Sequence, residues 1–231
     1  MYLASKIFDR VDCDRITPMD VILASSSPRR RQLLAFLGLE FRVAPADVDE
    51  SLLEGEGAPD YVQRLAAVKA QAVSAKYSDA LLIAADTTVV DGNQILGKPV
   101  DEEDAERMLR QLRGRSHWVY TGIALARNGD LVTDICGTEV PMRNFSDAEM
   151  TAYIATGDPL DKAGAYAIQH DGFYPVAELD GCYANVVGLP LCHLARLLQA
   201  QNIPLNVDIP AVCRATFGYN CPVYETILEN R

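Results

Sequence analysis

Short apolar runs of strand length alternate along this chain with longer segments that have the periodicity of helices. Residues 21–24 and 80–85 are uninterrupted apolar runs, and between them residues 60–76 place Val62 and Leu65 on one helical face. This alternation predicts an α/β fold, with helices packed against a sheet. The 231 residues fit one large domain or two small ones, and the sequence has no internal repeat.

Capping and turn residues predict where several elements begin and end. Ser27 followed by Pro28 is typical of a helix start, and Gly38 is typical of its end. The dipeptide Asn-Gly at 128–129 predicts a β-hairpin. The sequence Ser-Asp-Ala-Glu at 146–149 predicts a capping box at the start of another helix.

The signals weaken toward the C-terminus. Residues 165–168 and 172–176 look like strands, and Pro190 opens a helix with apolar residues at helical spacing. After Pro204 the periodicity fades, so residues 206–231 are predicted to be irregular.

The charge balance argues against two classes of partner. The chain has 32 acidic and 21 basic residues, which gives a formal net charge of -11. This charge disfavours broad binding to nucleic acid or anionic membranes, and aromatic residues are not interleaved with basic ones. The apolar runs are too short to span a bilayer, and residues 1–20 lack the apolar segment of a signal peptide. The six cysteines form no C-x-x-C pair, so we expect reduced thiols in a cytoplasmic protein.

A cluster of arginines stands out against this acidic background. The segment ILASSSPRRR, residues 22–31, joins a predicted strand to a predicted helix start. The first backbone N–H groups of a helix have no partner within it, and together with Arg29 and Arg30 they favour a phosphate. Ser25 and Ser27 can donate hydroxyl hydrogen bonds to the same anion. The alternative is a capped surface helix whose arginines are solvated.

Two acidic signals predict a site for a metal ion or a proton. Asp86 directly follows the apolar run 80–85, so we expect its carboxylate at the carboxyl end of a central strand, where ligands bind in open α/β sheets. There it can hold a divalent metal or accept a proton from water. Asp47, Asp49 and Glu50 follow another predicted strand, and paired acids can hold Mg²⁺ or Mn²⁺. The alternatives are an aspartate that ends a strand and a solvated acidic loop.

Two further segments carry polar groups suited to a nucleotide. Residues 92–98 nearly match a phosphate-binding P-loop, but Pro99 replaces the Ser or Thr that would bind Mg²⁺, so we reject that motif. Lys98 can still reach a phosphate as a point charge. Gln169, at the end of the segment 161–169, can pair with a base edge because its amide both donates and accepts hydrogen bonds. The alternative is a surface amide, and the sequence offers no pattern for a hydrolytic triad.

A series of short segments between about Val21 and Gln201 follows the order seen in one known family. The segments are LASSSPRRRQLL, VDES, RLAAVKA, AADTTVV, GKP, GRSHWVYTG, DKAGAYAIQ and NVVGLPL. In these segments the chain resembles the Maf family of nucleoside triphosphate pyrophosphatases. The resemblance implies an elongated mixed α/β sheet flanked by helices, like that of inosine triphosphate pyrophosphatases, with two lobes around a cleft. It divides the chain into an N-terminal extension (1–20), a Maf-like nucleotide pyrophosphatase domain (21–203) and an irregular C-terminal tail (204–231).

The resemblance also implies an activity. The expected reaction is hydrolysis of dTTP and UTP to a nucleoside monophosphate and pyrophosphate, with Mg²⁺ or Mn²⁺ as the divalent cation. The expected partners are the nucleoside triphosphate and a second copy of the chain in a homodimer, with neither nucleic acid nor a membrane. The alternative is a nucleotide-binding regulator of cell division, a septum inhibitor with weak turnover. Such a binder needs basic residues but not Glu50 and Asp86, and both are present.

Carried over by motif, the resemblance assigns roles to single residues. The expected catalytic residues are Asp86, Lys98, Arg29 and Arg30, with Asp86 orienting or deprotonating water. The residues expected to bind the substrate are Ser25, Lys69, Thr87 and Gln169. The expected metal ligands are Glu50 and Asp86. The subgroup that acts on dTTP and UTP is matched at Arg30, Thr87, Lys98 and Gln169, whereas His170 stands where a glycine is common.

Overall fold

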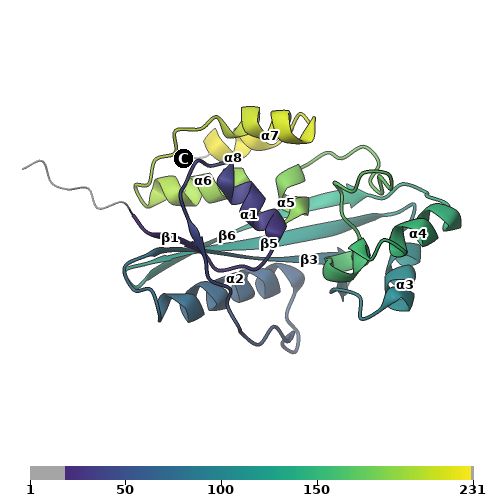
Figure 1. Ribbon diagram of the computed structural model, residues 1–231, viewed down its shortest axis with the longest axis horizontal. Coiled ribbons are helices and arrows are strands. Elements are labelled where there is room, and N and C mark those ends of the chain that lie inside the picture. Colours follow the sequence, from purple (N-terminus) through teal and green to yellow (C-terminus); the bar gives the residue numbers. More distant parts are fainter. Residues whose placement is uncertain (1–18, 230–231) are drawn as a thin grey trace, which may run out of the picture.

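A six-stranded mixed sheet forms the centre of the computed structural model, which describes residues 19–229 (Figure 1). The strands are β1 (Val21–Leu23), β2 (Arg42–Val43), β3 (Leu81–Asp91), β4 (Gln94–Leu96), β5 (Ser116–Arg127) and β6 (Asp130–Pro141). Their order is β2-β1-β3-β5-β6, and β4 pairs with β3 outside this path. β1 is parallel to β2 and β3, whereas the β3–β4, β3–β5 and β5–β6 pairs are antiparallel. The predicted α/β fold with a mixed sheet is confirmed.

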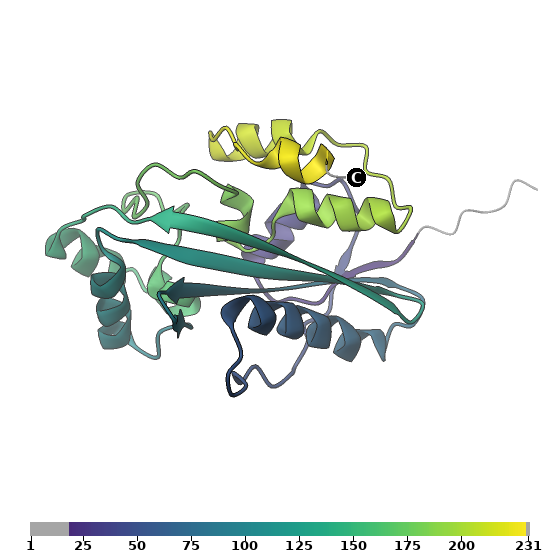
Figure 2. The ribbon, with the colours of Figure 1, turned by 180° about the vertical axis from the view of Figure 1, so that it is seen from behind.

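Helices cover both faces of this sheet. The first six α-helices are α1 (Pro28–Ala35), α2 (Ala58–Ser74), α3 (Glu102–Leu112), α4 (Asp147–Ile154), α5 (Tyr183–Val187) and α6 (Leu191–Ala200). α2 lies along one face, and α1, α5 and α6 cover the other (Figure 1; Figure 2). α3 and α4 lie together at one end of the long strands, where the short 3-10 helices η1 (Asp158–Asp161) and η2 (Ala163–Ala165) also pack.

Three clusters of buried apolar side chains hold these layers together. One lies between the sheet and the face covered by α1, α5 and α6, and a second lies between the sheet and α2. The third joins the other ends of the long strands to α3, α4 and η2. We call the part built on the first two clusters the first lobe, and the part built on the third the second lobe. This division agrees with the two lobes that the sequence predicted.

Gly122 on β5 lets α2 approach the sheet closely. A Cβ atom added at this position would lie 2.4 Å from the carbonyl oxygen of Val62 on α2. Only glycine permits such a close approach of a helix backbone to a strand. Lys69, about two turns further along α2, is thereby held next to β3.

The predicted caps and turns are present. The Ser27 hydroxyl accepts a hydrogen bond from the backbone N–H of Arg30 at 3.3 Å, which satisfies one of the free donors of α1. Ser146 and Glu149 form the capping box at the start of α4. Residues 128–129, both with positive φ, connect β5 and β6 in the predicted hairpin. Local polar chemistry therefore determines these element ends.

β3 is longer than the sequence predicted. Asp86 was expected at the carboxyl end of a strand, and this is wrong, because β3 continues to Asp91 and pairs with β5 beyond Asp86. A buried acid is tolerated within the strand because the Asp86 carboxylate is paired with Lys69. Asp86 therefore lies in the middle of a central strand, where it pairs with Gly122 of β5 on one side and faces the gap between β1 and β4 on the other.

The two predicted strands after residue 164 are also wrong. Residue 165 ends η2, and the rest of 165–168 and 172–176 lies in turns or irregular backbone. Their only ladder contact in the described structure is one bridge between Met142 and Val176. Gly164 and Ala165 have φ angles of +69° and +61°, which take the backbone out of an extended conformation. Their apolar composition reflects burial rather than strand formation.

The C-terminal residues that the structure describes are not irregular, contrary to the prediction. They form α7 (Ile209–Phe217) and α8 (Tyr224–Glu229), and α8 packs against α6. α7 has ordinary helix signals, because the Asp208 carboxylate accepts the N–H of Ala211 at 3.0 Å and Gly218 ends the helix with φ +62°. The apolar pattern between these caps is short, so apolar spacing alone does not reveal the helix.

The C-terminal helices contact the segment that leads into α5. The hydroxyl of Tyr219 accepts the N–H of Gly181 at 3.1 Å and lies 3.0 Å from the carbonyl oxygen of Leu179, to which it can donate. Phe217 stacks on Tyr183 with 4.5 Å between the ring centroids. α7 and the residues after it therefore pack against the segment 179–183, which leads into α5.

Five of the six cysteines lie among the described residues as free thiols. Cys136, Cys182 and Cys192 are buried, and burial raises the pKa of the Cys192 thiol to about 12. Cys13 and the rest of residues 1–18, most of the expected N-terminal extension, lie outside the described part of the chain. The boundaries expected between extension, domain and tail stay predictions. No helix within residues 19–229 combines the length and the apolar character needed to cross a membrane.

Candidate active site

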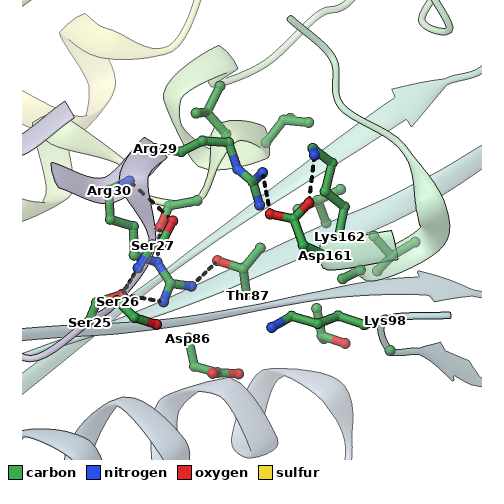
Figure 3. A pocket seen from close by; sticks show the side chains of 18 of the residues that line it. Ser25, Ser26, Ser27, Arg29, Arg30, Asp86, Thr87, Lys98, Asp161 and Lys162 are labelled. Carbon is green, nitrogen blue, oxygen red and sulfur yellow. Dashed lines mark hydrogen bonds and ion pairs between the residues drawn. The ribbon is translucent and has the colours of Figure 1, made fainter. Parts of the chain in front are cut away.

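A cavity of about 600 Å³ lies between the two lobes. Its walls come from the β1–α1 turn, the middle of β3, the residues after β4, the segment from η1 to Gln169, and α5. The nine residues to which the resemblance assigned roles all line this one cavity: Ser25, Arg29, Arg30, Glu50, Lys69, Asp86, Thr87, Lys98 and Gln169. Of the acids 47, 49 and 50, only Glu50 lines it. Figure 3 shows Arg30 directed at Thr87 on β3, Arg29 directed at Asp161, and Lys98 across the cavity from Arg30.

Two acids and a lysine form the floor of the cavity. The Lys69 ammonium lies 2.6 Å from Asp86 Oδ1 and 2.7 Å from Glu50 Oε1. Lys69 and Asp86 are buried, whereas the Glu50 side chain is 56% exposed. Burial raises the pKa of the Asp86 carboxyl, although the charges of Lys69 and Arg30 oppose this shift. Asp86 is thus a buried carboxylate of raised basicity that faces the cavity.

Arg30 is held by three elements at once. Its Nε donates to the carbonyl oxygen of Gly188 at 2.9 Å, after α5. One terminal nitrogen donates to Thr87 Oγ1 on β3 at 2.9 Å, and the other donates to Ser25 Oγ at 3.3 Å. Burial lowers the pKa of this guanidinium, and the charge of Asp86 raises it. The Arg30 side chain therefore fixes the relative positions of α1, β3 and α5 at the cavity wall.

A chain of hydrogen bonds continues from Arg30 into the core. Thr87 Oγ1 lies 2.9 Å from Thr121 Oγ1 on β5, and Thr121 Oγ1 donates to the backbone carbonyl of Asn185 at 3.2 Å. Because Thr121 uses its proton on Asn185, Thr87 must donate to Thr121 and accept from Arg30. The Asn185 amide in turn donates to Val119 O at 3.0 Å. The donor and acceptor roles of the Thr87 and Thr121 hydroxyls are thus fixed.

Sequence reasoning missed Thr121 and Asn185 as members of this network. Both are fully buried, and both lie in segments, GRSHWVYTG and NVVGLPL, that were noted without any chemistry attached to them. A polar residue inside an otherwise apolar segment is the signal that was available. The partner of each residue depends on the fold and could not be read from the sequence.

Lys98 and Gln169 face the cavity without a fixed partner. Within residues 19–229, neither the Lys98 ammonium nor the Gln169 amide makes a hydrogen bond to protein, and both residues are exposed. Gln169 is an exposed amide, and it nevertheless lines the cavity. Both side chains keep their full hydrogen-bonding capacity for a ligand.

A further ion pair crosses the cavity. Arg29 Nη1 on α1 lies 3.6 Å from Asp161 Oδ2 at the end of η1 (Figure 3). Asp161 also accepts from the ammonium of Lys162 at 2.6 Å. Five basic side chains (Arg29, Arg30, Lys69, Lys98 and Lys162) and three carboxylates (Glu50, Asp86 and Asp161) line the cavity. The cavity therefore has an excess of positive charge in a protein that is acidic as a whole, which suits a polyanion.

Comparisons of the sequence with known proteins identify the family of this chain. Residues 20–201 match the family described as Maf-like protein. A dTTP/UTP pyrophosphatase of Anaeromyxobacter dehalogenans is 50% identical over 194 residues, which cover 82% of this chain and 98% of that protein. A dTTP/UTP pyrophosphatase of Thermomicrobium roseum is 46% identical over 218 residues, 92% of this chain and 98% of the relative. The chain belongs to the Maf family.

Among solved structures, the Ham1 protein of Staphylococcus aureus has a TM-score of 0.41 and 14% sequence identity, over 54% of this chain and 72% of that chain.

Proposed function

We propose that this protein is a nucleoside triphosphate pyrophosphatase that hydrolyses dTTP and UTP to a nucleoside monophosphate and pyrophosphate. The observation that carries the proposal is the cavity, where Arg29, Arg30 and Lys98 lie opposite a buried carboxylate, Asp86. A nucleoside triphosphate carries about four negative charges, and phosphoryl transfer is catalysed mainly by positioned positive charge. Membership of the Maf family and the names of its relatives point to the same reaction.

A divalent cation, Mg²⁺ or Mn²⁺, fits the floor of the cavity. Glu50 and Asp86 both reach the Lys69 ammonium, at 2.7 Å and 2.6 Å, so their carboxylates converge on one place. The described residues contain no group of three or more His, Cys, Asp or Glu that could hold a metal. Two carboxylates suit Mg²⁺, which keeps several waters and takes its other ligands from substrate phosphates. When bound, the cation would neutralise phosphate charge and lower the pKa of water.

The other catalytic roles, which are proton acceptance, positioning and phosphate binding, fall to side chains of the protein. Asp86 accepts the proton of the attacking water, and its burial raises its pKa and so its strength as a base. Lys69 holds the two carboxylates in place and opposes their mutual repulsion. Arg29, Arg30 and Lys98 bind phosphate oxygens, and Ser25 supports Arg30.

Base selection is assigned to the group of Arg30, Thr87, Lys98 and Gln169. The fixed Arg30–Thr87 contact gives a rigid wall, and the free Gln169 amide can pair with O4 and N3–H of thymine or uracil. Cytosine presents the opposite pattern at these two positions. Because the free amide can reorient to pair with either pattern, we assign the discrimination to groups of the cavity wall that cannot reorient and that a mismatched base would leave unpaired.

We also propose that the protein acts in the cytoplasm as a homodimer. The second candidate, a nucleotide-binding regulator of cell division, needs the basic residues but has no use for a buried acid. The Asp86–Lys69–Glu50 arrangement favours hydrolysis over binding alone.

The deciding experiment measures pyrophosphate and monophosphate released by the purified protein with Mg²⁺. The panel is dTTP, UTP, dCTP, GTP and 7-methylguanosine triphosphate, and kcat/KM is compared. We expect dTTP and UTP to be preferred. Preference for either guanine nucleotide would overturn the base assignment alone, whereas absence of pyrophosphate release from every nucleotide would overturn the reaction.

A further inference from the structure

Asp161 is a carboxylate in a cavity suited to polyphosphate. It belongs to the second lobe, because η1 packs against α3 and α4, and it reaches across to Arg29 of the first lobe. The contact joins Asp161 Oδ2 to Arg29 Nη1 at 3.6 Å. Figure 3 shows the Asp161 carboxylate between the side chains of Arg29 and Lys162. An anion that binds Arg29 must therefore share it with Asp161 or displace the carboxylate.

Lys162 anchors Asp161 and is itself unavailable to substrate. Its ammonium donates to Asp161 Oδ1 at 2.6 Å, to Asp158 Oδ1 at 2.8 Å and to the Asp158 carbonyl at 2.6 Å. These bonds use all three N–H groups of a buried side chain. One oxygen of Asp161 is thus tied to its own lobe, and the other is directed at Arg29.

We propose that Asp161 is a positioning residue that holds Arg29 in the free enzyme and competes with phosphate for it, so that pyrophosphate binds less tightly and leaves faster. This inference rests on the proposed function. The Asp161 side chain is 62% exposed, so solvent screens the competition and its effect is modest. Binding that stabilises substrate, transition state and product equally slows product release without lowering the barrier of the chemical step, so weakening such binding favours turnover.

The test compares Asp161→Asn with the wild-type protein. The substitution removes the charge and keeps an oxygen that can accept from Lys162. We expect the dissociation constant of pyrophosphate, measured by calorimetry with Mg²⁺, and its inhibition constant in the dTTP assay to fall about two- to fivefold. The KM for dTTP should fall in the same direction, and kcat should not rise.

Asp147→Asn is the matched control. Asp147 is also 62% exposed and pairs with two arginines, Arg110 and Arg113, but it does not line the cavity. The two variants change net charge equally, so a general charge effect would appear in both. Only Asp161→Asn is expected to tighten pyrophosphate binding.

A double-mutant cycle tests the route through Arg29. In an Arg29→Ala background, Asp161→Asn should leave pyrophosphate affinity unchanged, which a merely structural role would not produce. If Asp161→Asn does not fold, Asp161→Ser is used with the same expected direction. Unchanged or weaker pyrophosphate binding in a folded Asp161 variant would overturn the inference. Failure of the wild-type protein to bind pyrophosphate or turn over dTTP would instead overturn the proposed function.

Discussion

The ammonium of Lys69 lies 2.6 Å from Oδ1 of Asp86, and both side chains are buried beneath the cavity. A buried carboxylate without a partner would be very costly, so the lysine makes a charged base possible inside the sheet. α2 can deliver Lys69 to this place because Gly122 lets the helix backbone approach β5. The candidate catalytic pair therefore depends on a packing detail on the neighbouring strand.

Asp86→Asn should abolish most turnover while nucleotide binding survives. The amide cannot accept the proton of water, and loss of a general base typically lowers kcat by about 10²- to 10⁴-fold. The basic wall of the cavity stays in place. Steady-state kinetics with dTTP measure the loss of turnover, and calorimetry with dTTP measures the retained binding. Circular dichroism checks the fold. A variant with near-wild-type kcat would exclude Asp86 as the base.

In a plot of kcat/KM against pH, the midpoint of the fall in activity on the acidic side should lie above 3.8, the ordinary pKa of an aspartate. Burial raises the pKa of Asp86, and a base works only when deprotonated, so activity is lost as the pH falls through that raised pKa. Lys69→Gln removes a charge that lowers this pKa, so the midpoint should move to higher pH. An unmoved midpoint in a folded Lys69→Gln protein would show that another group controls it.

Arg29 and Arg30 should respond differently to alanine. Each substitution should weaken transition-state stabilisation by about 1.5–3 kcal/mol, the range for charged hydrogen bonds. Arg30→Ala should also lower the melting temperature, because Gly188, Thr87 and Ser25 lose their common partner. Arg29→Ala should leave it nearly unchanged, since its ion-pair partner Asp161 is 62% exposed and the two groups are 3.6 Å apart.

Lysine at either arginine position should restore activity only in part, because it lacks the forked donors. The measurements are kcat/KM for dTTP and thermal unfolding of all four variants. Equal melting temperatures for Arg29→Ala and Arg30→Ala would contradict the bridging role of Arg30.

His117 should make the fold less stable in acid. Burial lowers its pKa to about 4 from an ordinary 6.5, so the unfolded chain binds a proton that the folded chain resists between these values. The free energy of unfolding is not reduced by His117 above pH 6.5. It falls as the pH drops toward 4, by at most about 3 kcal/mol. Burial also lowers the pKa of His193, which adds a loss of the same sign.

The check is urea unfolding of wild-type protein and His117→Gln at pH 7 and pH 4.5. The variant should lose less stability between the two pH values than the wild type. Identical losses would show that His117 does not contribute.

Gly122→Ala should destabilise the fold by about 1–3 kcal/mol or more, as overpacking does. The added Cβ would meet Val62 O at 2.4 Å and Val62 C at 2.5 Å, and a backbone cannot move aside cheaply. Gly97→Ala is the control, because nothing lies within 4 Å of its added Cβ and its φ is not positive. Thermal unfolding of both variants is the measurement. Equal melting temperatures for Gly122→Ala and Gly97→Ala would mean that α2 can shift without loss of stability.

The caps, the 128–129 hairpin and nine of the residues that line the cavity were within reach of the sequence, whereas the strands predicted after residue 164 and the irregular C-terminal segment were wrong. Ser27 and the capping box at Ser146 depend on contacts within four residues, which spacing alone reveals. The position of Asp86 within β3 was not accessible, because it depends on pairing with a strand about 35 residues away. Thr121 and Asn185 were missed for the same reason, since their hydrogen-bond partners come from other elements.

α7 and α8 lie beyond residue 201, where the match to the family ends, yet they cover part of the core. Cys213, Phe217 and Cys221 surround a small apolar space together with Cys182 and Cys192 from the matched region. A chain shortened to the family boundary would turn those two sulfurs and their apolar neighbours toward solvent, open to air oxidation and self-association. We therefore expect a stable protein to need residues beyond the segment that matches the family model.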